Sequence, residues 1–259
     1  MTKNIVTYSD LGRNGRLGNQ FFQIALTISY ALDTGKDFVF PEWEYRHWML
    51  QQIPQGHPAI DVRVPVDFHY APIPPHTDKN VDLFNGGQSS KYFAHHWDVI
   101  KRYLTLSYDY HYYILYKYKK ALNGNTCSIH VRRTDYCTPE KLEYHGVMPK
   151  SYYEEAVRKI YGKDNPEDVV FVICSDDLLW CKENFTFPNM LFIEGERDIF
   201  DMFIMAKCKN NIISNSSFSW WAAYLNRNEA KKVVCPQKWF GAACTHNSKD
   251  VPVDGWIVI

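Results

Sequence analysis

The carboxyl-terminal half of the chain alternates short apolar runs with stretches of helical periodicity. The alternation begins near Asn123, and each apolar run has the length of a strand. Repeated strand–helix units of this length predict a parallel sheet covered by helices, as in doubly wound nucleotide-binding domains. The expected strands are Ser128–Val131, Val169–Cys174, Leu191–Ile193, Asn211–Ser214 and Lys232–Cys235.

Helices are expected between these strands, and two of them carry start signals. Pro149 suits the first turn of a helix over Lys150–Tyr161, because proline has no N–H to leave unpaired there. Asp198 can act as the N-cap of a helix over Ile199–Cys208. The remaining helical patterns cover Leu178–Asn184 and Ser219–Leu225.

The amino-terminal half is less regular. Ile5–Tyr8 predicts a strand, a glycine-rich turn follows it, and a helix is expected over Gln20–Asp33. Phe38–Phe40 predicts a second strand, and residues 51–80, rich in Pro and His, are expected to be mostly loop. One apolar face of the helix is formed by Phe21, Ala25, Ile28 and Leu32.

A boundary between two domains is expected near Asn123-Gly124-Asn125, because Gly and Asn favour turns. Before it, residues 92–122 are expected to be helical. The sequence therefore predicts one domain over residues 1–122 and a second over residues 123–259.

The segment GRNGRLGNQ separates the first strand from its helix. Gly12, Gly15 and Gly18 allow a tight turn and a close approach to a ligand. Asn19 and Gln20 then open a helix whose first N–H groups attract an anion. The spacing differs from that of the dinucleotide fingerprint, and a glycine-rich turn is often only a turn. This segment supports a phosphate site without establishing one.

The segment SIHVRRTDY brings basic side chains to the end of a strand, where ligands of open α/β sheets bind. Because side chains alternate along a strand, His130 and Arg132 share one face and Arg133 points away. We expect Arg132 to meet a phosphate and Arg133 to brace the loop through Asp135. A surface Arg–Asp pair is the alternative for either arginine taken alone.

The segment NNIISNSSFSWWAAYLN reads as a strand, a serine-rich turn and an amphipathic helix. Its hydroxyl and N–H groups form a second candidate anion site, although Ser216 or Ser217 can equally act as a simple N-cap. Asp176, Asp177 and Asp201 lie at the end of the preceding strand or in the next helix, where a carboxylate can accept hydrogen bonds from guanine. For Asp176 and Asp177, helix capping is the commoner role.

Composition narrows the classes of function. Lys plus Arg and Asp plus Glu both number 29, whereas a nucleic-acid-binding protein would show a basic surplus. Aromatic residues make up 16% of the chain. Those left exposed suit a sugar-binding surface, since rings stack on the apolar faces of sugars, although core packing is the commoner role of any single ring.

Cysteine usage and hydropathy bear on the compartment. The seven cysteines show no Cys-x-x-Cys spacing, so free thiols of a cytoplasmic protein are expected rather than disulfides or a zinc site. The chain starts at Met1 and has neither a signal-peptide core nor an apolar run of about 18 residues. A protein without stable membrane insertion is therefore expected.

Read together, these segments resemble the alpha-1,2-fucosyltransferases of glycosyltransferase family 11. The resemblance is carried by GRLGNQFFQIAL, SIHVRRTDY, HGVMPKSYYEEAV, FVICSDD, DMFIMAKCKNNIISNSSFSWWAAYLN, CPQKWF and GWIVI, in the family's order. HVRRTD and SNSSFSWWAAYLN are the specific matches. GGQSSKYF matches in position but lacks the aromatic residue often found before its Gln, which leaves the acceptor preference open.

The resemblance implies an α/β fold of the GT-B type, with two Rossmann-like domains facing each other across a cleft. Residues 1–122 would form the acceptor-side domain and residues 123–259 the domain that binds the GDP-sugar. GDP-fucose would be the donor substrate, an oligosaccharide the acceptor, and no cofactor would be needed.

The related alpha-1,6- and protein O-fucosyltransferases show similar motifs, and this similarity implies roles for single residues. His130 and Asp201 would contact guanine, Arg132 the β-phosphate, and Ser216 or Ser217 the phosphates. Gly18 and Asn19 would reach the diphosphate from the other domain. Asp176 and Phe218 would complete the nucleotide site.

The expected reaction inverts the anomeric centre, so it needs one general base for the attacking hydroxyl and a group that stabilises the departing GDP. The spacing seen in the alpha-1,6 enzymes implies Glu140 as the base, and Asp135 and His145 are rivals. No Asp-x-Asp motif occurs in the chain, so Arg132 is expected to do the work of a metal ion.

Three readings of the function follow. The first is transfer of L-fucose from GDP-fucose to a glycan hydroxyl, with O2 of a terminal galactose as the family default. The second is a GT-B transferase with another GDP-sugar or linkage, such as alpha-1,6 or O-fucosyl transfer. The third is a non-catalytic glycan- or nucleotide-binding module, which the complete set of phosphate-binding segments argues against.

Overall fold

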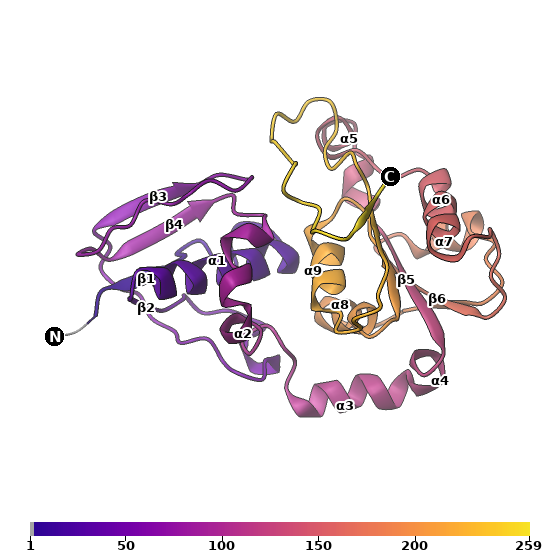
Figure 1. Cartoon of the computed structure of the whole chain (residues 1–259), viewed down its shortest axis with the longest axis horizontal. Helices are drawn as coiled ribbons and strands as arrows, with labels where there is room; N and C mark the ends of the chain where they lie inside the picture. Colours follow the sequence, from indigo (N-terminus) through magenta and orange to yellow (C-terminus); the bar gives the residue numbers. More distant parts are fainter. Residues whose placement is uncertain (1–2) are drawn as a thin grey trace. The chain divides into compact units, whose positions relative to one another are not determined.

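The computed structural model describes residues 3–259, which form two compact units (Figure 1). The first unit runs as far as His111 and includes His246–Val251, and the second comprises Tyr112–Thr245 and Pro252–Ile259. The sequence placed the boundary between residues 122 and 123, after helix α4 (Lys119–Leu122). The units instead divide within helix α3 (Tyr108–Lys117), whose carboxyl-terminal turns belong to the second unit.

A buried carboxylate explains why α3 joins the second unit. Glu196, whose side chain is only 4% exposed, accepts hydrogen bonds from the hydroxyl groups of Tyr113 and Tyr118. It also accepts a hydrogen bond from the ammonium group of Lys117 at 2.5 Å. A buried carboxylate needs such donors. No local sequence signal marks this contact, because its partners lie far apart in the chain.

The first unit holds a parallel sheet in the order β2-β1-β4-β3, with helix α1 (Leu17–Asp33) packed against β1 and β2. Most of α1 is buried, and of its expected apolar face only Leu32 is exposed, because it lies in the last turn. The shorter helices are Arg46–Trp48, Ser90–Tyr92, Ala94–His96 and α2 (Trp97–Ile100). The strands are β1 (Ile5–Thr7), β2 (Asp37–Phe38), β3 (Val62–Val66) and β4 (Val81–Asn85).

Two expectations for this half were wrong in part. The segment 51–80 is not only loop, because β3 lies within it as an edge strand. The segment 92–122 is not one helical region but is divided into α2, α3 and α4. The break between α2 and α3 contains Leu106, which forms an antiparallel bridge with Met49 and so leaves the helical path.

The second unit holds a parallel sheet in the order β10-β9-β8-β5-β6-β7. Helices α6 and α7 cover one face, and α8 and α9 cover the other (Figure 1). The strands are β5 (Asn125–Val131), β6 (Val169–Ser175), β7 (Met190–Phe192), β8 (Asn210–Ile212), β9 (Val233–Cys235) and β10 (Ile257–Val258). The helices are α5 (Pro139–His145), α6 (Lys150–Tyr161), α7 (Leu178–Asn184), α8 (Asp198–Ala206) and α9 (Ser217–Leu225).

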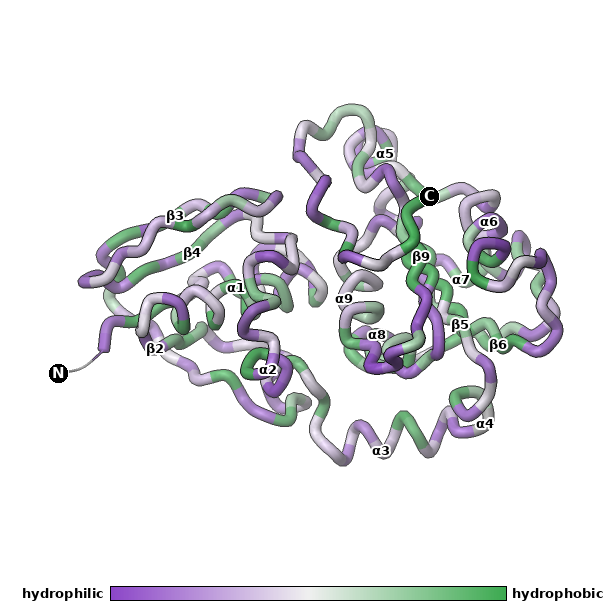
Figure 2. Tube along the Cα trace, in the orientation of Figure 1, coloured by the Kyte–Doolittle hydropathy of each residue, from purple (hydrophilic) through white to green (hydrophobic). Residues whose placement is uncertain are grey.

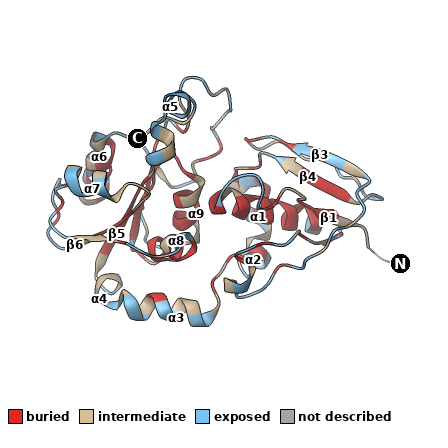
Figure 3. Ribbon diagram, turned by 180° about the vertical axis from the view of Figure 1, so that it is seen from behind, coloured by how far each residue is buried: buried red, intermediate tan, exposed pale blue. Residues whose placement is uncertain are grey.

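The central strands β5 and β6 are largely hydrophobic and buried, as Figures 2 and 3 show. Alternate residues of β5 pack under α6, in a cluster that includes Ile129, Tyr153 and Phe171. The expected bounds of α6 and α7 are confirmed. Two start signals are displaced by one residue: Pro149 is the N-cap of α6, and Asp198 is the first residue of α8 rather than its N-cap.

The seven cysteines are free thiols, and five of them are buried. None of the helices within residues 3–259 has both the length and the apolar character that a bilayer crossing requires.

Candidate active site

In the second sheet, the order in which the chain adds strands reverses between β5 and β8. Strands β6 and β7 lie on one side of β5, and β8, β9 and β10 lie on the other. In open parallel sheets, ligands bind in the crevice outside the carboxyl ends of the strands at such a switch point. The pairs Ile129–Ile212 and Val131–Ser175 bring the ends of β5, β8 and β6 together. The topology alone therefore predicts that a ligand binds to the segments that follow β5, β6 and β8.

His130 joins the end of β5 to the turn before α9. Its Nδ1 atom lies 2.8 Å from the hydroxyl oxygen of Ser214, and its ring centroid lies 5.2 Å from that of Phe218. Burial, and secondarily the charge of Arg132, lower the pKa of His130 to about 3. His130 is therefore a neutral imidazole at physiological pH, suited to hydrogen bonding rather than to pairing with a phosphate charge.

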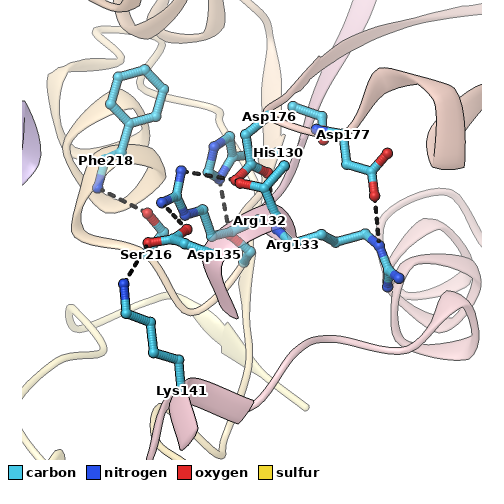
Figure 4. A network of polar contacts seen from close by, with 12 residues as sticks. His130, Arg132, Arg133, Asp135, Lys141, Asp176, Asp177, Ser216 and Phe218 are labelled. Carbon is cyan, nitrogen blue, oxygen red and sulfur yellow. Dashed lines mark hydrogen bonds and ion pairs between the residues drawn. The ribbon is translucent and has the colours of Figure 1, made fainter. Parts of the chain in front are cut away.

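Arg132 lies on the same face at the centre of a polar network (Figure 4). Its guanidinium pairs with Asp135 and, at 2.9 Å, with Asp176, and it lies over the ring of Tyr136. The side chain is only 12% exposed. The expectation that Asp135 binds Arg133 is wrong. Because the loop turns back toward Arg132, Asp135 pairs with Arg132 and, at 3.5 Å, with Lys141.

Arg133 points away from this network, as the alternation along the strand predicts (Figure 4). Its Nε atom lies 3.3 Å from a carboxylate oxygen of Asp177, and its guanidinium lies 4.2 Å from the ring centroid of Trp180. Arg133 therefore does brace the loop, but against α7 rather than through Asp135.

The two aspartates after β6 have different roles: one caps a helix, and the other binds the loop after β5. Asp177 is the N-cap of α7 and accepts the backbone N–H of Trp180 at 3.1 Å. Asp176 accepts the backbone N–H of Arg133 at 2.9 Å and the hydroxyl of Thr134, in addition to its ion pair with Arg132. Asp176 is thus engaged with the β5 loop, and its effect on a nucleotide would be exerted through Arg132.

The serine-rich turn forms the start of α9. Ser216 is the N-cap, and its hydroxyl accepts the backbone N–H of Phe218 at 3.4 Å, whereas Ser217 is the first helical residue. The positive end of the helix dipole therefore lies beside His130, which contacts Phe218. Capping and anion binding are compatible at such a helix start.

One carboxylate oxygen of Asp201 is unsatisfied. Within residues 3–259, its buried Oδ1 atom has no hydrogen-bond partner. Burial, followed by the charges of Glu196 and Asp198, raises the pKa of Asp201 to about 7. Its charge also contributes to the raised pKa of Cys174, which places it near the carboxyl end of β6. A buried acceptor without a donor fits a ligand that supplies N–H groups.

Comparisons with known proteins identify the family of the chain. Residues 8–259 match the family model described as glycosyl transferase family 11. The chain belongs to this family. Family membership confirms the resemblance inferred from the motifs around β5 and α9.

Among curated members, the chain is 45% identical over 150 residues to the O-antigen biosynthesis glycosyltransferase WbnK of Escherichia coli, covering 55% of the chain and 48% of the relative. It is 38% identical over 141 residues to an alpha-1,2-colitosyltransferase of the same species, covering 52% and 48%. Human galactoside alpha-(1,2)-fucosyltransferase 1 is 27% identical over 240 residues, covering 82% and 64%. The chain thus spans about half the length of the two bacterial relatives.

Solved structures show the same architecture. The fucosyltransferase NodZ from Bradyrhizobium superposes with a TM-score of 0.57 at 15% identity, covering 87% of this chain and 94% of that one. POFUT1 in complex with GDP-fucose gives a TM-score of 0.52 at 12% identity, covering 90% and 98%. The family 11 chain therefore has the α/β fold of the GT-B fucosyltransferases.

The candidate bases of this family 11 protein differ in their surroundings. Glu140, in the first turn of α5, is exposed and has no hydrogen bond or ion pair within the described part of the chain. His145, at the end of α5, stacks on Tyr136 at 4.2 Å, and burial lowers its pKa. Asp135 is held by Arg132 and Lys141. To take up an acceptor hydroxyl, Asp135 would have to release two ion pairs, whereas the exposed Glu140 would not.

In the first unit of the family 11 chain, Gly18 and Asn19 lie in the first turn of α1. Asn19 accepts a hydrogen bond from the amide of Gln88 at 3.0 Å. The glycine-rich turn is held by side chains of α1: Gln20 donates to the carbonyl of Gly15 at 3.1 Å. Gln20 therefore ties the turn to the helix that follows it.

Sequence reasoning missed two residues that shape the candidate site. The ring of Tyr136 contacts both the guanidinium of Arg132 and the ring of His145, and the hydroxyl of Ser214 lies within hydrogen-bonding distance of His130. Both lie inside the two motifs that had been singled out, so motif membership was the available signal. Their roles depend on contacts across the sheet that one sequence does not display.

Proposed function

We propose that the protein transfers L-fucose from GDP-fucose to a hydroxyl of an acceptor glycan, with O2 of a terminal galactose as the target. The observation that supports this most strongly is the nearly buried Arg132 at the switch point of the sheet. Membership of family 11 and the human galactoside alpha-(1,2)-fucosyltransferase relative support the reaction and its linkage.

In the proposed mechanism, the diphosphate of the donor lies between Arg132 and the start of α9. As the bond from fucose to the β-phosphate breaks, negative charge develops on GDP. Arg132 and the helix dipole of α9 stabilise that charge. Asp135 and Asp176 hold the guanidinium in place beforehand, so little reorganisation is needed during the reaction. This arrangement requires no metal ion.

Glu140 is the proposed general base. It takes the proton from the acceptor hydroxyl as that oxygen attacks the anomeric carbon from the face opposite GDP, which inverts the configuration. His130 and Asp201 are the proposed contacts to guanine. The neutral ring of His130 and the unsatisfied oxygen of Asp201 suit the neutral, hydrogen-bonding edge of a base.

Binding of GDP is expected to weaken as the pH falls. A carboxylate that accepts N–H groups of guanine must be ionised, and the pKa of Asp201 in the free protein is raised to about 7. Below that pH the free protein is increasingly protonated, so GDP affinity should fall toward tenfold per pH unit. Calorimetry between pH 8 and pH 5.5 measures this fall.

The Asp201→Asn variant provides the control for that experiment. It should bind GDP more weakly at pH 8 and retain only the pH dependence caused by titration of GDP itself. Identical pH profiles for the variant and the wild type would show that Asp201 does not contact the nucleotide.

The proposed reaction is tested by incubating the protein with GDP-fucose or GDP-mannose and a panel of galactose-terminated acceptors. An alpha-1,2-linked fucosyl product, identified by NMR and formed at the same rate in excess chelator, is the expected result. Binding of GDP without product from any donor or acceptor would favour the non-catalytic module.

A second candidate keeps the site and changes the donor sugar. The relative that is 38% identical is named an alpha-1,2-colitosyltransferase, and the one that is 45% identical is named for O-antigen biosynthesis. Offering GDP-colitose beside GDP-fucose in the same assay distinguishes the two. A larger kcat/KM for GDP-colitose would assign the chain to that donor.

A further inference from the structure

Asp33, His95 and His96 bring metal-ligating atoms together in the first unit. The Nε2 atom of His96 lies 2.8 Å from Oδ1 of Asp33, and Nε2 of His95 lies 3.1 Å from both carboxylate oxygens. One ligand atom from each residue lies within 4.8 Å of the others. In a tetrahedral zinc site with bonds of about 2.0–2.1 Å, ligand atoms are about 3.3 Å apart. A small movement of the two rings would therefore admit an ion.

The backbone holds these side chains together. Asp33 is the last residue of α1, and both histidines belong to the short helix Ala94–His96. Immediately before that helix, the buried side chain of Phe93 packs against Phe22 of α1, with ring centroids 6.1 Å apart. The segment that carries the two imidazoles is thus held against α1 by a hydrophobic contact. Such prior positioning reduces the entropy lost when a ligand binds.

The types of metal-ligating atoms determine which class of ion the site would bind. Two imidazoles and one carboxylate suit Zn²⁺ and similar transition-metal ions, whereas Mg²⁺ and Ca²⁺ prefer sites made of oxygen ligands. The carboxylate of Asp33 and the ring of His95 are about half exposed, so water can complete the coordination. Without metal, each Nε2 must carry a hydrogen to donate to Asp33. In the complex that hydrogen leaves Nε2, and the neutral ring carries its hydrogen on Nδ1.

We propose that Asp33, His95 and His96 bind a divalent transition-metal ion that fastens the segment before α2 to the end of α1. The same segment carries Gln88, whose amide binds Asn19 at the start of α1. An ion at the histidines would hold the segment to the helix at a second point. Its role is stabilisation of the first unit, and it takes no part in the transfer chemistry proposed for Arg132 and Glu140.

The test is titration of the untagged, full-length protein with zinc chloride, followed by calorimetry and by metal analysis after gel filtration. The wild type should bind one equivalent, resist displacement by millimolar Mg²⁺, and melt at a higher temperature when loaded. Cobalt chloride should give the visible absorption of a low-coordinate nitrogen–oxygen site.

Three variants decide the assignment. His96→Ala and Asp33→Asn should each lower the zinc affinity by at least tenfold and lose the rise in melting temperature. His57→Ala, which removes another histidine of the same unit, should behave as the wild type. Circular dichroism establishes that each variant is folded. Because His96→Ala and Asp33→Asn remove different proposed ligands, the same loss of zinc binding is expected in both. Equal zinc binding by all proteins, or none by the wild type, would overturn the proposal.

Discussion

Replacing Arg132 with alanine is expected to lower the rate of fucose transfer by about 10²–10³-fold and to abolish measurable binding of GDP. The factor corresponds to the loss of one pre-positioned donor to a developing oxyanion. Arg132 is also nearly buried between Asp135 and Asp176, so its removal leaves two carboxylates facing the place proposed for the diphosphate. Steady-state kinetics and calorimetry measure the two effects.

Arg158→Ala is the matched control for that variant. Arg158 lies in the same unit, is about half exposed, and pairs with Asp164 at 2.8 Å on the surface of α6. Exposed pairs of this kind contribute little to stability, so GDP affinity and turnover should both remain near wild type. Unchanged GDP affinity in Arg132→Ala would mean that the phosphate site lies elsewhere.

Replacing Glu140 with glutamine is expected to lower kcat by about 10²–10⁴-fold, because the variant cannot accept the proton of the attacking hydroxyl. Binding of GDP should be unchanged, since no hydrogen bond or ion pair within residues 3–259 joins the Glu140 side chain to Arg132, Asp135 or Asp176. This separation between kcat and GDP affinity distinguishes a base from a residue that holds the nucleotide.

Glu143→Gln serves as the control, because Glu143 is exposed on the same short helix. Near-normal turnover by Glu140→Gln would contradict the assignment. In that case His145→Gln and Asp135→Asn become the decisive variants. His145 as the base would give a pH–rate profile that falls below its lowered pKa, and this fall would vanish in the glutamine variant.

The face of β5 on which each side chain lies could be predicted from the sequence, because the alternation of side chains along a strand is a local property. The period of two residues puts His130 and Arg132 on one face and Arg133 on the other, and the contacts follow that pattern. The helices α6 and α7 were equally accessible, since their amphipathic patterns are set by residues close in the chain.

The partners of Arg132 could not be predicted, because they depend on strand order and register. Val131 of β5 pairs with Ser175 of β6, so the next residues, Arg132 and Asp176, become neighbours. Without knowledge that β5 and β6 are adjacent, Asp176 is one of several aspartates. The same holds for the loop after β5, whose path decides which arginine Asp135 binds.

Strand β3 shows how a local rule can mislead. Pro65 interrupts an alternating apolar pattern, and proline removes a backbone donor from a sheet. The strand forms nevertheless because it lies at the edge of the sheet, where one side needs no ladder hydrogen bonds. The return of residues 246–251 to the first unit could likewise not be predicted from the sequence. The contacts of this segment include the ion pair of Asp250 with Lys91 and the stacking of His246 on Phe68, and both partners lie far earlier in the chain.

The central claim is that a nucleotide diphosphate binds between the strand end bearing Arg132 and the start of α9. A crystal structure of the protein with GDP tests it most directly. The account predicts a β-phosphate oxygen about 2.7–2.9 Å from the guanidinium of Arg132 and within hydrogen-bonding distance of the α9 amino terminus. GDP bound elsewhere, or an Arg132 still paired only with Asp135 and Asp176, would contradict it.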